Sequence, residues 1–178
     1  LIDRGILVRE NGSFRLEGSL ETLEVPESLQ ALIAARLDGL ELQERRLLQD
    51  AAVLGRTFTL QGLVAITGLS EGEVSALLSS LVGKEGLSMS IDTMLSDRGQ
   101  YGFLQDLVKK VAYDTMSKRE RKARHVAAAA YLRSVTDEDE TVEVVASHLL
   151  DAYLAAPDDD DAEQVRRDAL AMLRKASE

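Results

Sequence analysis

The stretch from Phe103 to His125 constrains the fold of this chain more than any other part of the sequence. It passes from the end of a strand into a helix, and then through a Ser-led turn into a second, strongly basic helix. Ser117 and Glu120 have the spacing of a capping box, in which each residue satisfies a backbone N–H group of the other. We therefore predict two helices after the strand, the second running from Ser117 through Arg133.

The composition favours packed helices. The 178 residues are 45% hydrophobic but only 4% aromatic, with no Trp, whereas β-sandwich cores depend on aromatic and β-branched residues. The length allows one full domain and part of another. Cysteine is absent, which excludes disulfides and thiolate metal sites. We predict a mainly α protein.

Residues 1–40 look like the end of an upstream module. A helix end near Gly5 is followed by a small hairpin that turns at Asn11 and Gly12, a dipeptide suited to positive φ. Pro26 can open a helix whose predicted apolar stripe comprises Leu29, Leu32, Ile33, Leu37 and Leu40. The chain starts inside a helical pattern without an initiator Met, so we expect a fragment of a longer protein.

Residues 41–116 predict a winged-helix domain. Helices are expected at 44–54, ended by Gly55 in a left-handed conformation, at 59–67, capped by Thr59 and stopped by Gly68, and at 70–82. Ser70 and Glu73 form a second capping-box pattern. From Leu87 the apolar period changes to two, and Gln100 to Leu104 can return antiparallel across the polar loop 92–99, which gives a two-stranded wing.

Residues 117–178 predict the start of a tetratricopeptide-like α-solenoid. Two acidic turns, Asp137 to Glu140 and Asp158 to Asp161, each precede a helix, whose N-terminal dipole favours negative charge. The apolar spacing predicts that these two helices bury Val142, Val145, Ala146, Leu149 and Tyr153, and then Val165, Ala169, Met172, Leu173 and Ala176. Too few helices are present to establish a repeat.

A winged helix suggests DNA binding, but the charges argue against it. No Lys or Arg occurs from Thr57 to Gly83, and Glu71 and Glu73 would face phosphate at the start of the third helix. The stretch Gln105 to Val135 is different, since it holds 8 basic and 3 acidic residues in a chain of net charge −10. Its basic residues form a candidate interaction surface, which comprises Lys109, Lys110, Lys118, Arg119, Arg121, Lys122 and Arg124. Such a surface can bind nucleic acid, contact the acidic turns of a neighbouring domain, or simply face the solvent, and we favour the last two alternatives.

The residues predict no catalytic, cofactor-binding or metal site. His125 and His148 lack a carboxylate or second His at a helpful spacing, so we expect them to pack or to hydrogen-bond. The Asp runs lack the Gly and Glu of an EF-hand loop, and Gly83-Lys84-Glu85 lacks the rest of a phosphate-binding loop. We expect no enzyme activity from this chain. No membrane-spanning run or signal peptide is present, so we expect a cytoplasmic protein without a membrane partner.

Three segments together resemble the region after the nucleotide-binding core of bacterial STAND-class signalling ATPases: PESLQALIAARLDGL, ERRLLQDAAVLGRTF and YGFLQDLVKKVAYDTMSKRERKARH. The resemblance covers Leu1 to about Tyr153 and is closest to predicted ATPases fused to class III adenylate/guanylate cyclase or to transcriptional-regulator domains. Tyr113, Arg121 and His125 keep the Y…R…H pattern of these proteins, whereas Gln105 stands where many of them carry His.

The resemblance implies that residues 1–40 close an ATPase module, which would hold ATP and Mg upstream, while this chain itself takes no cofactor. It implies a regulatory segment whose partners are its own upstream ATPase module and an unknown protein or small-molecule effector on the helical array. The alternative is a DNA-binding winged-helix transcriptional regulator, with Lys118 to Arg124 on phosphate. The identity of the effector and of the output domain stays open.

Overall fold

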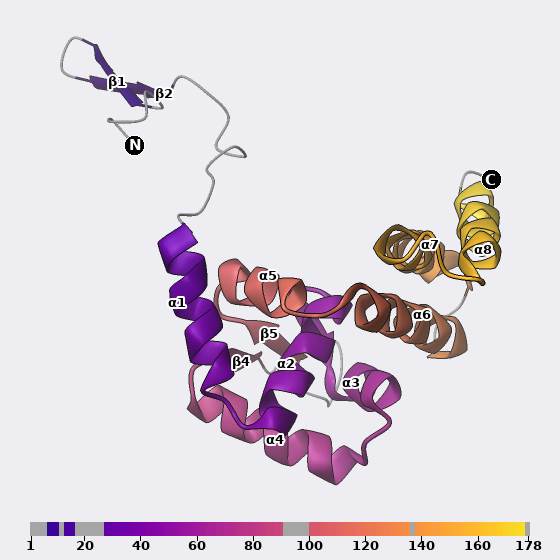
Figure 1. Cartoon of the computed structure of the whole chain (residues 1–178), viewed down its shortest axis with the longest axis horizontal. Coiled ribbons are helices and arrows are strands. Elements are labelled where there is room, and N and C mark those ends of the chain that lie inside the picture. Colours follow the sequence, from indigo (N-terminus) through magenta and orange to yellow (C-terminus); the bar gives the residue numbers. More distant parts are fainter. Residues whose placement is uncertain (1–6, 11–12, 17–26, 91–99, 136–137, 177–178) are drawn as a thin grey trace. The chain divides into compact units, whose positions relative to one another are not determined.

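The computed structural model describes residues 7–10, 13–16, 27–90, 100–135 and 138–176, and the chain divides into two compact units, Leu1–Ala31 and Leu32–Glu178. In the first unit, strands β1 (Leu7–Glu10) and β2 (Ser13–Leu16) pair antiparallel, with Glu10 opposite Ser13 (Figure 1). The predicted hairpin is therefore confirmed. Its turn residues and the predicted helix end near Gly5 lie outside the described residues.

Helix α1 (Glu27–Asp38) confirms the predicted helix but not its whole apolar stripe. Ile33 and Leu37 are buried, and Leu40 packs against the same core. Leu29 and Leu32, predicted on that stripe, are instead exposed. Apolar spacing shows which residues share a helix face, but it does not show how much of the helix another element covers.

The next elements have the connectivity of a winged helix. They are α2 (Leu42–Leu54), β3 (Thr57–Thr59), α3 (Leu60–Thr67), α4 (Glu71–Gly83), β4 (Leu87–Ser90) and β5 (Gln100–Phe103). The sheet has the order β3-β5-β4 and both pairings are antiparallel. The predicted wing strands are present, but the sheet has three strands rather than two because Thr57–Thr59 pairs with the far edge of β5. The predicted loop 92–99 lies outside the described residues.

The predicted caps fix where these helices start and stop. The Thr59 hydroxyl accepts a hydrogen bond from the Gly62 N–H at 3.1 Å, and Gly68 ends α3 in a left-handed conformation with φ 70°. Ser70 and Glu73 form the predicted capping box of α4. Gly55 does end α2 at positive φ, but its angles, φ 130° and ψ −161°, are not the predicted left-handed helical ones.

The core of the winged helix lies between its three helices and the sheet. Fully buried leucines come from α2, α3 and α4, and Phe58 of β3 packs on Phe103 of β5 with ring centroids 5.9 Å apart. Helix α5 (Asp106–Asp114), the first of the two helices predicted after the strand, covers this core with Val111 and Ala112. The other large side chains of this core are Leu47, Leu48, Leu63, Val74, Leu78, Leu81 and Leu87.

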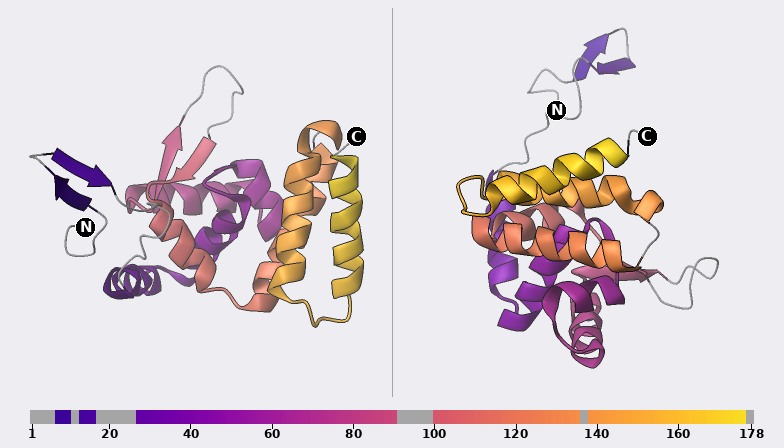
Figure 2. Two further views of the ribbon diagram at one scale, coloured as in Figure 1. Left: turned by 90° about the horizontal axis from the view of Figure 1, so that it is seen from above. Right: turned by 90° about the vertical axis from the view of Figure 1, so that its right-hand side faces the viewer.

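Three longer helices complete the second unit: α6 (Lys118–Val135), α7 (Glu138–Ala155) and α8 (Ala162–Lys175), which lie side by side in Figure 2. They share a core of Ala129, Val145, Leu149, Ala152, Val165 and Ala169. Of the residues predicted to be buried here, Tyr153, Met172 and Ala176 are half-buried and Leu173 is exposed. No helix among the described residues is both long and apolar enough to cross a membrane.

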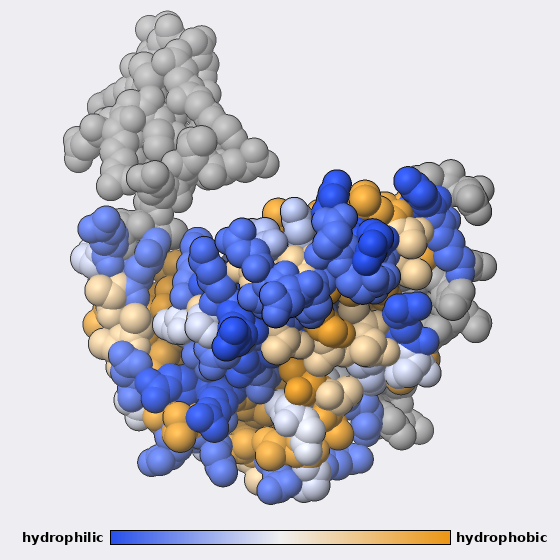
Figure 3. Space-filling view, turned by 45° about the vertical axis from the view of Figure 1, so that its right-hand side comes forward, coloured by the Kyte–Doolittle hydropathy of each residue, from blue (hydrophilic) through white to orange (hydrophobic). Residues whose placement is uncertain are grey.

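Helix α6 also packs on the winged helix. Ala128 of α6 is fully buried against Val53 of α2 and Met116 of the turn before α6, with Ile66 and Tyr113 alongside. The helical region is therefore in contact with the winged helix through a shared apolar cluster. Figure 3 shows hydrophilic and hydrophobic residues interleaved on one face of this unit.

Candidate coupling site on helix α6

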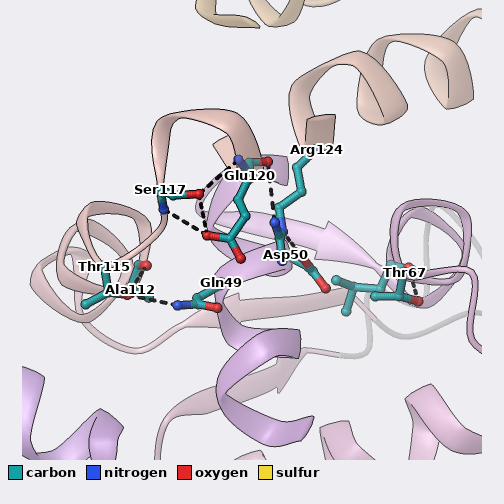
Figure 4. A network of polar contacts seen from close by, with 9 residues as sticks. Gln49, Asp50, Thr67, Ala112, Thr115, Ser117, Glu120 and Arg124 are labelled. Atoms are coloured by element: carbon teal, nitrogen blue, oxygen red, sulfur yellow. Dashed lines mark hydrogen bonds and ion pairs between the residues drawn. The ribbon is translucent and has the colours of Figure 1, made fainter. Parts of the chain in front are cut away.

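The first turns of α6 carry most of the candidate interaction surface, so the local structure of this helix start decides where those charges point. The predicted capping box is present: the Ser117 N–H donates to Glu120 Oε2 at 2.9 Å, and the Glu120 N–H donates to the Ser117 hydroxyl at 3.3 Å. These hydrogen bonds lower the pKa of the Glu120 carboxyl. The box fixes the first turn of α6 and with it the directions of the basic side chains that follow (Figure 4).

Lys122 points toward the turn between α7 and α8. Its side chain is 8% exposed, and its ammonium group pairs with Asp159 at 2.8 Å and with Asp161. Burial lowers the pKa of Lys122, but the hydrogen bonds to the two carboxylates outweigh burial and leave the pKa above its ordinary value. The predicted acidic turn is thus the partner of this lysine within the same chain.

Arg124 points the other way, onto the winged helix. Its guanidinium pairs with Asp50 of α2, and the two side chains are only 17% and 10% exposed. Burial raises the pKa of the Asp50 carboxyl, and Arg124 partly offsets that effect. A second polar contact lies nearby, where Gln49 donates to the Thr115 hydroxyl at 3.1 Å (Figure 4).

His125 lies in a hydrogen-bonded chain across three helices. The Tyr113 hydroxyl of α5 is 2.9 Å from His125 Nε2, and His125 Nδ1 is 3.0 Å from Nδ1 of His148 on α7. His125 is 3% and His148 8% exposed. Each contact needs one donor and one acceptor, so the hydrogen bonds run either from Tyr113 toward His148 or in the reverse direction.

The three side chains of this hydrogen-bonded series, Tyr113, His125 and His148, are uncharged near pH 7. Burial, followed by the charges of His148, Arg121 and Lys109, lowers the pKa of His125 to about 4. Burial also lowers the pKa of His148, although Asp151 partly opposes this shift. Burial raises the pKa of the Tyr113 hydroxyl. The chain is therefore built from uncharged groups and serves to hold the three helices together.

The remaining predicted surface residues have different surroundings. Lys110 pairs with Asp114 on its own helix at 2.6 Å, and Arg121 donates to the Asp114 carbonyl at 2.9 Å while its guanidinium lies 4.8 Å from the centre of the Tyr113 ring. Lys109 lines a pocket with His125 and Asp151. Lys118 and Arg119 are exposed. Of the seven predicted residues, Lys122 and Arg124 are thus largely buried in ion pairs, whereas Lys110, Lys118 and Arg119 are exposed.

The would-be recognition helix α4 offers little to a nucleic acid. Its exposed positions include Glu71, Gly72 and Ala76, and the Glu73 carboxylate is held in the capping box. Lys84, just beyond α4, is paired with the buried carboxylate of Glu44 at 2.6 Å. The hydrogen bonds that the Glu44 carboxylate accepts from Lys84 and, with a smaller effect, from Ser80 lower the pKa of Glu44. The ammonium group of Lys84 is therefore already paired within the fold.

Within the described ranges, no group of three or more His, Asp or Glu residues is arranged to hold a metal ion. The two histidines use their Nδ1 atoms on each other. Sequence reasoning did not find the pairing of His125 with His148, because the residues lie on different helices and share no spacing pattern. The Y…R…H resemblance did point to Tyr113, Arg121 and His125, which the structure brings together.

Comparisons with known proteins add little to this geometry. No protein-family model and no curated protein matches the sequence. Among solved structures, the crystal structure of an organohalide-sensing transcriptional regulator in its 2,4-dichlorophenol-bound form aligns over 82% of this chain and 90% of its own. The identity is 14% and the TM-score 0.39, a level that does not establish a common fold.

Proposed function

We propose that this chain is a non-catalytic regulatory segment of a multidomain, ATP-dependent signalling protein of the STAND class. In this proposal, ATP and Mg bind an upstream module, and the winged helix passes the state of that module to the helices α6–α8. The helices would bind an effector or a partner protein. An adenylate/guanylate cyclase or DNA-binding domain elsewhere in the protein would give the output.

The observation that carries the proposal is the position of α6. Within one turn, Lys122 contacts the α7–α8 turn, Arg124 contacts α2, and His125 contacts both α5 and α7. A displacement of α6 relative to the winged helix would break its contacts with α2 and α5, and a displacement relative to α7 and α8 would break those with His148 and the α7–α8 turn. Coupling between two regions needs an element that contacts both of them, and α6 is such an element.

Two further features support the proposal. The shared core of α6, α7 and α8 includes small residues, Ala129, Ala152 and Ala169, which allow helices to pack closely, as in stacked helical repeats. The winged helix carries acidic and small residues where a DNA reader would carry cations, which favours protein contact. We propose on this basis that α6–α8 begin a tetratricopeptide-like array.

The test uses the protein with its upstream module. The reading frame before Leu1 should encode G-x-x-x-x-G-K-[ST] at a strand-to-helix turn. Hydrogen exchange of that protein, with and without ATP, should then show a change of protection in α6–α8 as well as in the winged helix. An upstream reading frame without the motif, or hydrogen-exchange rates in α6–α8 that are the same with and without ATP, would overturn the proposal.

The second candidate is a DNA-binding regulator, which the winged-helix connectivity favours. Among the basic residues at the start of α6, Lys118 and Arg119 are the exposed ones, and they lie at the N-terminus of the helix. If they contact phosphate, affinity for duplex DNA must fall steeply with salt, and the double variant Lys118→Glu, Arg119→Glu must abolish it. We expect no such binding at physiological ionic strength.

A further inference from the structure

A mostly apolar cavity of about 240 Å³ lies between the C-terminal half of α1 and the winged helix. Leu37 of α1, Leu48 of α2 and Leu81 of α4 form buried walls, and Val108 of α5 closes one side. Apolar cavities of this kind take up hydrocarbon or aromatic groups in preference to water. The cavity is separate from the contacts of α6 described above.

The rim of the cavity is polar and asymmetric. The Arg36 guanidinium donates one N–H to the Lys84 carbonyl at 2.8 Å, which fixes its position at the rim while using one of its five donors. The Lys84 ammonium is engaged with both oxygens of Glu44, at 2.6 and 2.7 Å. Of the two cations that line this rim, Arg36 is therefore the one whose side chain is not paired with a carboxylate there.

The backbone at the rim carries strain. Glu85 has φ 57° at the end of α4, in the region that favours glycine, while Gly86 N–H donates to the Leu81 carbonyl to complete the helix end. Together with the hydrogen bond from the Glu85 N–H to the Val82 carbonyl, this is a Schellman helix end, in which the residue after the cap takes the left-handed conformation. Glu85 and Gly86 both line the cavity.

We infer that this cavity binds a small apolar monocarboxylate, with its hydrocarbon or aromatic body against Leu37, Leu48 and Leu81 and its carboxylate on Arg36. A guanidinium can hold a carboxylate through two parallel hydrogen bonds, which favours this group over a neutral one. The negative charge of Glu85 at the same rim disfavours phosphates and other ligands of higher charge. This inference does not rest on the proposed function.

The test is an NMR titration of the full 178-residue chain with phenylacetate, followed through the leucine methyl groups. We expect saturable shifts at Leu37, Leu48 and Leu81, and about tenfold weaker binding of the neutral analogue phenylacetamide. Arg36→Gln, a change at an exposed side chain, should weaken phenylacetate binding by about tenfold and leave phenylacetamide unchanged.

A matched pair of glycine variants tests whether phenylacetate binds inside this cavity. A methyl group on Gly86 would lie 3.5 Å from Leu48 Cδ1 and 4.0 Å from Leu81 Cδ2, ordinary contacts that allow folding but narrow the cavity. Gly86→Ala should weaken binding by about tenfold, whereas Gly83→Ala, whose added methyl meets nothing within 4 Å, should not. Absence of saturable shifts, equal affinity in the two glycine variants, or no effect of Arg36→Gln would overturn the inference.

Discussion

The ion pair between Arg124 of α6 and Asp50 of α2 gives the sharpest quantitative prediction. Removing one partner of a buried pair leaves an uncompensated charge and costs about 3–5 kcal/mol of unfolding free energy. Since the two side chains retain 17% and 10% exposure, water relieves part of this penalty. We therefore expect Asp50→Asn and Arg124→Met each to cost about 3 kcal/mol, at the low end of that range.

The assay is urea unfolding followed by circular dichroism, because the chain has no Trp. The double variant should cost less than the sum of the single variants by about 2 kcal/mol, since neither charge is then left alone. The control cycle uses Lys110 and Asp114, a pair with side chains 59% and 49% exposed, and should show a coupling below about 0.5 kcal/mol. Additive costs at Asp50 and Arg124, or a coupling no larger than the control's, would show that the pair does not stabilise the contact between α6 and α2.

Three further predictions concern the hydrogen-bonded chain and the end of α4. Tyr113→Phe should cost about 1–2 kcal/mol because it leaves the buried Nε2 of His125 without its partner; a penalty near zero in urea unfolding would contradict this. His125, with its pKa lowered from 6.5 to about 4 in the folded protein, should contribute stability that is complete above about pH 6.5 and lost as the pH falls toward 4, by up to about 3 kcal/mol. The difference in unfolding free energy between the wild type and His125→Gln, measured across that range, should therefore change with pH, and a constant difference would be the contrary result. Glu85→Gly should raise the unfolding free energy by about 0.5–1 kcal/mol by removing strain at φ 57°, whereas a loss in thermal melts would show that the side chain itself stabilises the fold.

Local patterns in the sequence were enough to predict most of the secondary structure. Capping boxes, the glycines after α2 and α3, and apolar spacing act over a few residues, and they located α3, α4 and α6 closely. The strand Thr57–Thr59 was missed because three residues carry no usable alternation and its pairing partner lies more than 40 residues away. Exposure of Leu32 was likewise missed, since it depends on which other element covers the helix.

The candidate site was less predictable because its contacts join distant parts of the chain. The basic residues were recognised as a group from their density in the sequence, and an acidic turn was one of the partners considered for them. Which residue meets which partner depends on the helix packing: Lys122 reaches Asp159, and Arg124 reaches Asp50. The meeting of His125 with His148 depends on the crossing of α6 and α7, which no local pattern encodes.

The most direct test of the central claim, that α6 couples the winged helix to the helices after it, is hydrogen exchange of the Asp50→Asn variant measured helix by helix. The substitution lies in α2 and removes the carboxylate that pairs with Arg124 of α6. We expect exchange to accelerate in α6 and in α7 around His148 by about tenfold more than in α4, whose change reports the global loss of stability, and we expect Lys110→Met to have no effect on any of these helices. Faster exchange confined to α2 and the first turn of α6, with α7 and α8 as in the wild type, would contradict the claim.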